Sequence, residues 1–252
     1  ASARGGCAGG AEMRSFARRA GLASALVAAL VAGWAPPVGE PLPVPAVPAE
    51  FPEAYYREAL AQGKPVYRVD PSASLVVIEV RRSGSLARLG HDHVVASHDV
   101  GGYVAPDEGR GDLYVPLGRL AVDEPKLRAE AGFETQPTES DIAGTRANML
   151  EKVLEADAFP YALIRIRGVD ARQPDAAIGI DLTLHGTTRA LQVPARVETQ
   201  GDSMTVTGRF SLDQTDFGIT PYSILGGAIA VRNAVDLKFR IRALRVPAAQ
   251  PR

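Results

Sequence analysis

The sequence predicts an all-β, antiparallel fold of about eight strands, closed as a barrel or packed as a sandwich, with one inserted helix. Three observations support this fold class. After residue 65, apolar and polar side chains alternate with period two in most segments, which is typical of half-buried strands. Short turns separate several of these segments, and one central segment has helical spacing instead. With 252 residues, the chain is long enough for one large β domain.

Residues 1–35 are interpreted as upstream sequence followed by a secretory signal. The first methionine is Met13, and a basic stretch with Arg18 and Arg19 precedes an apolar run over residues 20–35. A basic segment followed by a short apolar one is typical of a signal peptide. The alternative is a short membrane anchor, although the run is short for a bilayer span. We therefore expect a periplasmic or secreted protein with a signal peptide that starts at Met13.

Residues 36–63 are interpreted as a proline-rich linker and a short helix. The prolines that crowd residues 36–48 favour extended backbone. Pro52 suits the first position of a helix over residues 52–60, and Gly63 suits its C-terminal cap. The rest of the chain is divided into a β domain over residues 64–246 and a tail over residues 247–252.

The last strand has the clearest pattern. Its apolar side chains share one face, and they are Ile229, Val231, Val235, Leu237, Phe239 and Ile241. Charged side chains such as Lys238 and Arg240 lie on the other face, which predicts a strand with one buried and one hydrated side. Similar alternation predicts strands over residues 76–80, 93–104, 112–117, 161–169, 178–184, 191–197 and 204–212. Turns are expected at residues 185–188 and 200–202.

One segment, residues 138–154, breaks the β pattern. Its apolar residues recur at helical spacing, and Thr138 and Asp141 suit a capping box at the start of a helix. A helix inserted between strands is expected to cover a barrel end or to line its mouth.

Composition excludes several function classes. The chain has 28 basic and 29 acidic residues and a net charge of −1, so no nucleic-acid partner is expected. Cys7 is the only cysteine and precedes Met13, so the β domain has neither a disulfide framework nor a thiol nucleophile. A packed core must therefore stabilise this domain.

No pattern in the sequence predicts catalysis. The motifs G-x-S-x-G, H-E-x-x-H and C-x-x-C and a glycine-rich phosphate loop are all absent. The carboxylate pairs at residues 107–108 and 123–124 lie beside proline or glycine and are interpreted as solvated loop charges. We therefore expect no enzymatic activity and no cofactor.

His91 and His93 are the most distinctive polar residues. In a strand they would share a face, which is one arrangement for metal ligands, but no third ligand is obvious. The alternative is a structural role or a hydrogen bond to the head group of a ligand. No metal site is therefore predicted. His185 lies in a predicted hairpin turn and is interpreted as structural.

The order of these segments resembles the YceI-like family of periplasmic proteins. The resemblance covers roughly residues 65–243 and is carried by Leu89-Gly90-His91-Asp92-His93, by residues 141–150, 156–161, 182–189 and 214–219, and by the long final strand. It implies a lipocalin-like, extended barrel of eight antiparallel strands that is not an enzyme. It also implies an elongated apolar cavity for a polyisoprenoid, a quinone or a fatty-acid-type amphiphile. The polar segment over residues 126–137 has no clear counterpart in the family pattern.

We therefore expect an exported carrier that binds a long-chain isoprenoid or another apolar small molecule inside a barrel. The polar candidates for ligand binding at the mouth are His91, His93, Arg146 and Tyr161. The apolar candidates in the walls are Ile78, Ile164, Ile180, Phe210 and Phe239. Sequence alone does not separate cavity lining from simple packing, because both demand the same alternation.

Two alternative functions stay open at this point. One is a metal- or redox-linked periplasmic protein that uses His91 and His93. The other is a ligand-free, stress-related barrel that acts through its surface. The sequence also leaves open whether the barrel forms a homodimer and whether it contacts a membrane transiently to load its ligand.

Overall fold

The computed structural model describes residues 47–168 and 175–247. The predicted signal peptide and most of the proline-rich linker lie outside the described residues. Within the described ranges, no helix is both long enough and apolar enough to cross a membrane.

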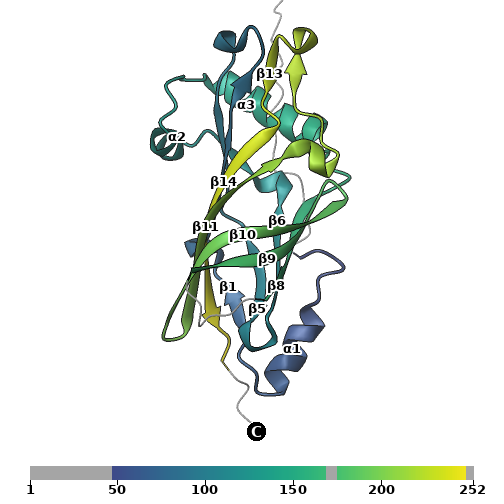
Figure 1. The fold of residues 1–252 in the computed structure, drawn as a ribbon, viewed down its shortest axis with the longest axis vertical. Helices are drawn as coiled ribbons and strands as arrows, with labels where there is room; N and C mark the ends of the chain where they lie inside the picture. Colours follow the sequence, from purple (N-terminus) through teal and green to yellow (C-terminus); the bar gives the residue numbers. More distant parts are fainter. Residues whose placement is uncertain (1–46, 169–174, 248–252) are drawn as a thin grey trace, which may run out of the picture. The chain divides into compact units, whose positions relative to one another are not determined.

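A closed antiparallel barrel forms the body of the part of the chain that the structure describes (Figure 1). Its strands are β1 (Tyr67–Val69), β5 (Gly101–Ala105), β6 (Arg110–Pro116), β8 (Tyr161–Arg167), β9 (Asp175–Leu184), β10 (Thr187–Gln200), β11 (Ser203–Asp213) and β14 (Ala234–Arg245). They pair in this order, and β1 also pairs with the end of β14, which closes a ring of eight strands. The predicted eight-stranded antiparallel barrel is confirmed.

Further strands extend the wall beyond the ring. β2 (Leu75–Val80), β4 (His93–Ser97) and β7 (Ala121–Val122) continue the sheet from the first half of β14. A separate small sheet contains β12 (Ser223–Ile224), β13 (Ile229–Val231) and β3 (Arg82–Ser83). Of these three strands, β13 lies within the predicted last strand, whereas β12 and β3 were not predicted, because two residues are too few to show a period.

Two predicted strands are interrupted. The segment 93–104 forms β4 and β5 with a connection at residues 98–100, and the last strand is divided into β13 and β14. At the second break, the Asn233 side chain donates to the Thr215 hydroxyl over 2.8 Å and accepts from the Thr215 amide. Thr215 lies in the 3-10 turn (Gln214–Phe217) that follows β11. The alternation of side chains therefore continues through Asn233, which is not part of either strand.

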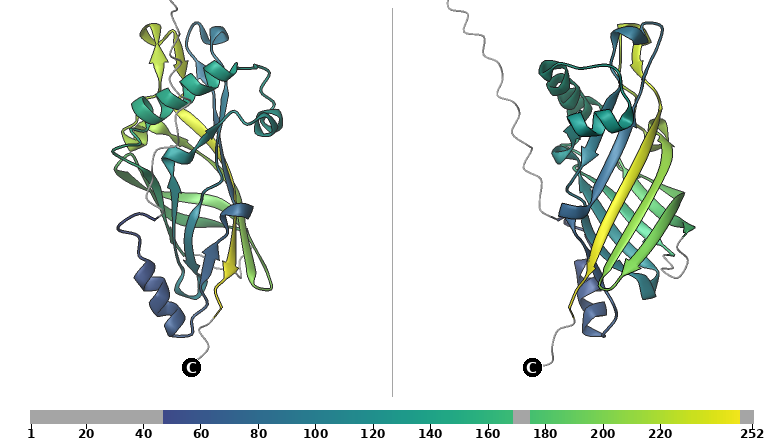
Figure 2. Two further views of the ribbon diagram at one scale, coloured as in Figure 1. Left: turned by 180° about the vertical axis from the view of Figure 1, so that it is seen from behind. Right: turned by 90° about the vertical axis from the view of Figure 1, so that its left-hand side faces the viewer.

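The inserted helix is present and covers one end of the barrel (Figure 2). It is α3 (Glu139–Asn148), and it continues as a π-helical turn over Met149–Val153. The predicted capping box is confirmed, since Asp141 N–H donates to the Thr138 hydroxyl and Thr138 N–H donates to the Asp141 carboxylate. Ile142, Met149 and Leu154 pack against the barrel core.

Two further helices lie outside the barrel. The predicted N-terminal helix is α1 (Glu53–Ala61), which packs on the outer wall through Tyr56, whose hydroxyl donates to the buried carboxylate of Asp112 over 2.7 Å. A third helix, α2 (Pro125–Ala131), was not predicted. Its signal was present, because Pro125 occupies the first turn and Gly132 caps the end with a left-handed backbone.

Candidate ligand-binding site

The barrel encloses an apolar cavity of about 230 Å³. Every lining side chain except Ser97 is apolar. On β8, Ala162, Ile164 and Ile166 line the cavity, while the residues between them point to the outer face. The period of two in a strand therefore produces both the dry interior and the wet exterior of this wall.

All five apolar candidates from the sequence line this cavity. They are Ile78, Ile164, Ile180, Phe210 and Phe239. The rings of Phe210 and Phe239 meet edge to face with centroids 6.3 Å apart. Opposite Phe239, the partner on β11 is Gly208, where an added Cβ would lie 2.5 Å from the Phe239 ring. The glycine therefore gives this ring the room to lie along the wall.

A second cavity of about 490 Å³ lies at the end of the barrel that α3 covers. It adjoins the first, because both cavities are lined by Ile78, Leu120, Leu154, Leu184, Leu212 and Leu237. Unlike the first, it has many polar lining residues, namely Arg82, His91, His93, Ser140, Asp141, Thr145, Asn148, Gln214 and Tyr222. The combined space therefore has an apolar interior and a polar mouth, which is a common design of small-molecule sites.

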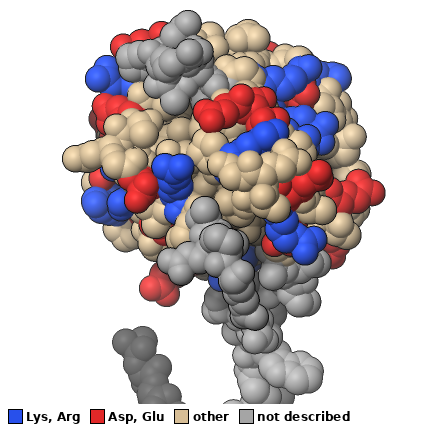
Figure 3. All heavy atoms as spheres, turned by 90° about the horizontal axis from the view of Figure 1, so that it is seen from below, with Lys and Arg blue, Asp and Glu red and all other residues tan. Residues whose placement is uncertain are grey.

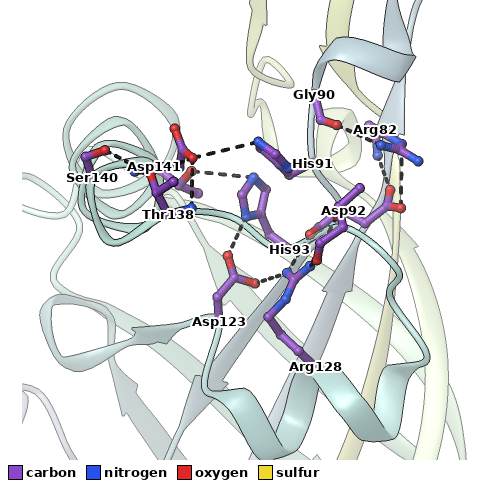
Figure 4. A network of polar contacts seen from close by, with 12 residues as sticks. Arg82, Gly90, His91, Asp92, His93, Asp123, Arg128, Thr138, Ser140 and Asp141 are labelled. Atoms are coloured by element: carbon purple, nitrogen blue, oxygen red, sulfur yellow. Dashed lines mark hydrogen bonds and ion pairs between the residues drawn. The ribbon is translucent and has the colours of Figure 1, made fainter.

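A buried carboxylate orients His93 at this mouth (Figure 4). The Asp123 Oδ2 atom lies 2.6 Å from His93 Nδ1, and Asp123 Oδ1 accepts from the Val94 amide over 2.9 Å. The buried guanidinium of Arg128 donates to the same carboxylate and to the Asp92 carbonyl. This cluster connects β4 to the segment that precedes α2.

The charge state of Asp123 follows from these contacts. Burial alone would raise the pKa of the carboxyl. The hydrogen bonds from His93, from the Val94 amide and from Arg128 outweigh burial and hold the pKa of Asp123 below its usual range. Asp123 is therefore ionised at neutral pH and acts as a hydrogen-bond acceptor.

The carboxylate also determines what His93 offers to the cavity. Because an ionised carboxylate only accepts, the hydrogen of a neutral His93 ring lies on Nδ1, and Nε2 is left as an acceptor. Nε2 lies 3.4 Å from the Thr145 hydroxyl on α3. His91 lies close by, with its ring centroid 6.1 Å from that of His93, and its buried Nδ1 has no hydrogen-bond partner in the described part of the chain. Two imidazoles and a hydroxyl therefore meet at the polar mouth.

Among the described residues, no third metal ligand joins these histidines. In residues 47–168 and 175–247, no group of three or more His, Cys, Asp or Glu side chains is placed to hold a metal ion. The His91 Nε2 atom has only a 3.9 Å approach to Asp141. The metal-linked alternative thus gains no support from this part of the chain.

The other two polar candidates do not line either cavity. Arg146 extends from α3 and donates to the carbonyls of Gly118 and Leu120 over 2.6 and 3.2 Å, so it fastens the helix to the connection that follows β6. The ring of Tyr161 lies edge-on to Tyr114 at 5.9 Å, on the outer side of β8. Of the four polar candidates, the cavities bring together His91 and His93 only.

Sequence reasoning was wrong about Asp123 and missed Arg128. Asp123 is 3% exposed instead of being a solvated loop charge, and its φ of 58° lies in the left-handed region. Nothing local links residue 123 to residue 93, since the pair forms only when the segment after β7 crosses the start of β4. The neighbouring Glu124 does lie at the surface, where it contacts His98.

Comparison with known proteins agrees with this geometry. The family model of the YceI-like domain matches residues 67–243. A polyisoprenoid binding domain from Saccharophagus degradans, implicated in plant cell wall breakdown, has a TM-score of 0.53 and 11% identity, over 71% of this chain and 98% of that one. BcnA of Burkholderia cenocepacia has a TM-score of 0.51 and 16% identity, over 69% and 98%. A comparison with curated proteins gives no match.

Proposed function

Because this chain belongs to the YceI-like family, we propose that it is an exported carrier that binds one long apolar ligand inside its barrel. The observation that carries the proposal is the barrel cavity, whose lining is apolar except for Ser97. An eight-stranded barrel has room for one slender ligand besides its own side chains. Each methylene that leaves water for such a cavity contributes about 0.8 kcal/mol.

The proposal also assigns an orientation to the ligand, and the polar mouth supports it. The tail occupies the barrel, and the head group lies beside His91, His93 and Thr145, where an acceptor nitrogen and a hydroxyl are available. Candidate cargoes are a polyisoprenoid, a quinone or a fatty-acid-type amphiphile. The polyisoprenoid is favoured because the Saccharophagus degradans domain with the same fold is described as binding one. On this proposal the protein binds and releases its cargo unchanged, without catalysis.

The first test is mass spectrometry of an organic extract from untagged protein purified from its own host. We expect one long-chain species at near-stoichiometric amount. Extraction of buffer from the same column provides the blank. A clean extract from folded protein would contradict the carrier proposal and would favour a barrel that acts through its surface.

Export is the second part of the proposal, and it rests on the basic and apolar segments that follow Met13. We expect to find the protein in the periplasmic fraction, which is released when the outer membrane is permeabilised. Its N-terminus, determined by mass spectrometry, should lie beyond the apolar run that ends near residue 35. Retention of the complete apolar run on a membrane-bound product would support the short-anchor alternative instead.

A further inference from the structure

Two neighbouring hairpins carry exposed apolar side chains at the end of the barrel that α3 covers. Leu89 ends a 3-10 turn (Ala87–Leu89) before β4, Ile224 ends β12, and Leu225 begins the turn that leads to β13. Their exposed fractions are 59%, 43% and 70%, and these three residues are here called the tip surface. Such exposure of large apolar side chains in one region indicates an interaction site.

The small sheet holds the two hairpins together. Ala230 pairs with Ser83, and the Leu86 amide donates to the Ala228 carbonyl over 2.7 Å. Figures 1 and 2 show the two hairpins side by side, extending beyond α3. The two hairpins therefore form one surface in the fold, although Leu89 is more than a hundred positions away from Ile224 and Leu225 in the chain.

The tip surface is continuous with the mouth of the cavity. Leu89 and Ile224 are exposed to solvent and also line the larger cavity, together with Ile229 behind them. A ligand that leaves at this end would pass from the cavity wall directly onto these side chains. The apolar path therefore reaches the outside of the molecule at the tip surface.

The charges around the tip surface are basic. Residues 83–91 and 220–233 contain Arg88 and Arg232, both exposed, and no Asp or Glu, although the chain has 29 acidic residues. The next acidic residue, Asp92, lies 3.7 Å from the basic Arg82. The acidic Asp141 on α3 is set at the cavity mouth, 3.9 Å from His91. The opposite end of the barrel differs, since acidic and basic side chains alternate over it (Figure 3). Exposed apolar residues flanked by cations suit an anionic lipid interface.

We propose that the tip surface docks on an anionic lipid bilayer and places the cavity mouth against the membrane for ligand exchange. The docking proposal depends on the proposed carrier function, because ligand exchange is the reason for docking. Its own evidence is the apolar exposure, the continuity with the cavity and the exposed Arg88 and Arg232 on hairpin segments that contain no Asp or Glu. Docking would let the apolar chain move between bilayer and barrel without crossing water.

The test is flotation of the purified mature protein with vesicles of phosphatidylcholine, with and without phosphatidylglycerol. We expect binding to the anionic vesicles only. L225D and L89D should each reduce the bound fraction about tenfold, and R88A about fivefold with a weaker salt dependence. The matched control is L244D, because Leu244 is 41% exposed near the far end of β14, and it should bind like the wild type.

Several results would overturn the docking proposal. One is equal flotation of the wild type and L225D, with both proteins shown to be folded by circular dichroism. Another is a dimer in sedimentation velocity that L225D dissociates while vesicle binding is absent, which would assign the surface to a second copy. Ligand mass spectrometry on the same samples separates the two proposals. A ligand-bearing protein that ignores vesicles contradicts docking alone, and an empty protein that binds them contradicts the carrier alone.

Discussion

Replacing Ile164 by Trp is expected to empty the barrel of its ligand. Ile164 lies in the middle of β8, opposite Leu113 and Leu182 on the two neighbouring strands, and it lines the apolar cavity. An indole at this position would occupy space that the ligand tail needs. If it displaces about three methylenes, the loss of about 2.4 kcal/mol corresponds to about fiftyfold weaker binding.

The matched control for this variant is L163W. Leu163 is the preceding residue on the same strand, is 37% exposed, and points to the outer face. This variant should keep its ligand, because the same side chain is added outside the wall. Ligand content per protein, measured by mass spectrometry of organic extracts, compares the two. Unchanged ligand content in I164W would show that the tail does not reach this part of the barrel.

Replacing Asp123 by Ala is expected to have the largest effect on stability. Arg128 is 5% exposed, and Asp123 supplies its only carboxylate contact among the described residues. Removal of one partner leaves a buried cation uncompensated, which costs about 3–5 kcal/mol in the free energy of unfolding. It also releases the His93 ring from its fixed orientation. Denaturant unfolding followed by circular dichroism measures the loss.

Glu124 offers the control in the next position of the chain. Its contact with His98 is exposed, so E124A should change the free energy of unfolding by less than about 1 kcal/mol. Similar losses in D123A and E124A would show that the buried cluster contributes no more than a surface pair. The comparison therefore isolates the effect of burial.

The same cluster predicts a pH dependence. The pKa of Asp123 is lower in the folded protein than the value of about 3.9 in an unfolded chain. Its contribution to stability is therefore complete above that unfolded value and is lost as the pH falls through the folded pKa. The wild type should lose more stability than D123A between neutral and acidic pH. Part of this loss of stability at acidic pH should persist in D123A, because the pKa of Asp112 is also below its usual range in the folded protein.

The walls of the site could be predicted because strand periodicity is a local property. A side chain on the buried face must be apolar at every second position, whatever strand lies beside it. This is why Ile78, Ile164, Ile180, Phe210 and Phe239 could be chosen from the sequence and why all five line the cavity. The inserted helix was equally local, since Thr138 and Asp141 form its capping box within one turn.

The polar site could be predicted only in part. His91 and His93 could be singled out because histidine is rare in this chain and because the two lie two positions apart. The hydrogen-bond partners of His93 come from distant segments. Asp123 looked like any charge in a loop beside a proline, and only its position behind β4 makes it a buried partner of His93. Arg146 could not be distinguished from a mouth residue until the carbonyls that it binds were known.

By itself, the sequence determined the antiparallel strands, the inward faces of the walls and the capped helix, because each depends on neighbours within a few residues. The tertiary structure alone decided the closure of β1 on β14, the contact of His93 with Asp123 and the meeting of two hairpins at the tip surface. These contacts join residues that are 30 to more than a hundred positions apart. Their geometry depends on strand register and barrel closure, which no local pattern of side chains records.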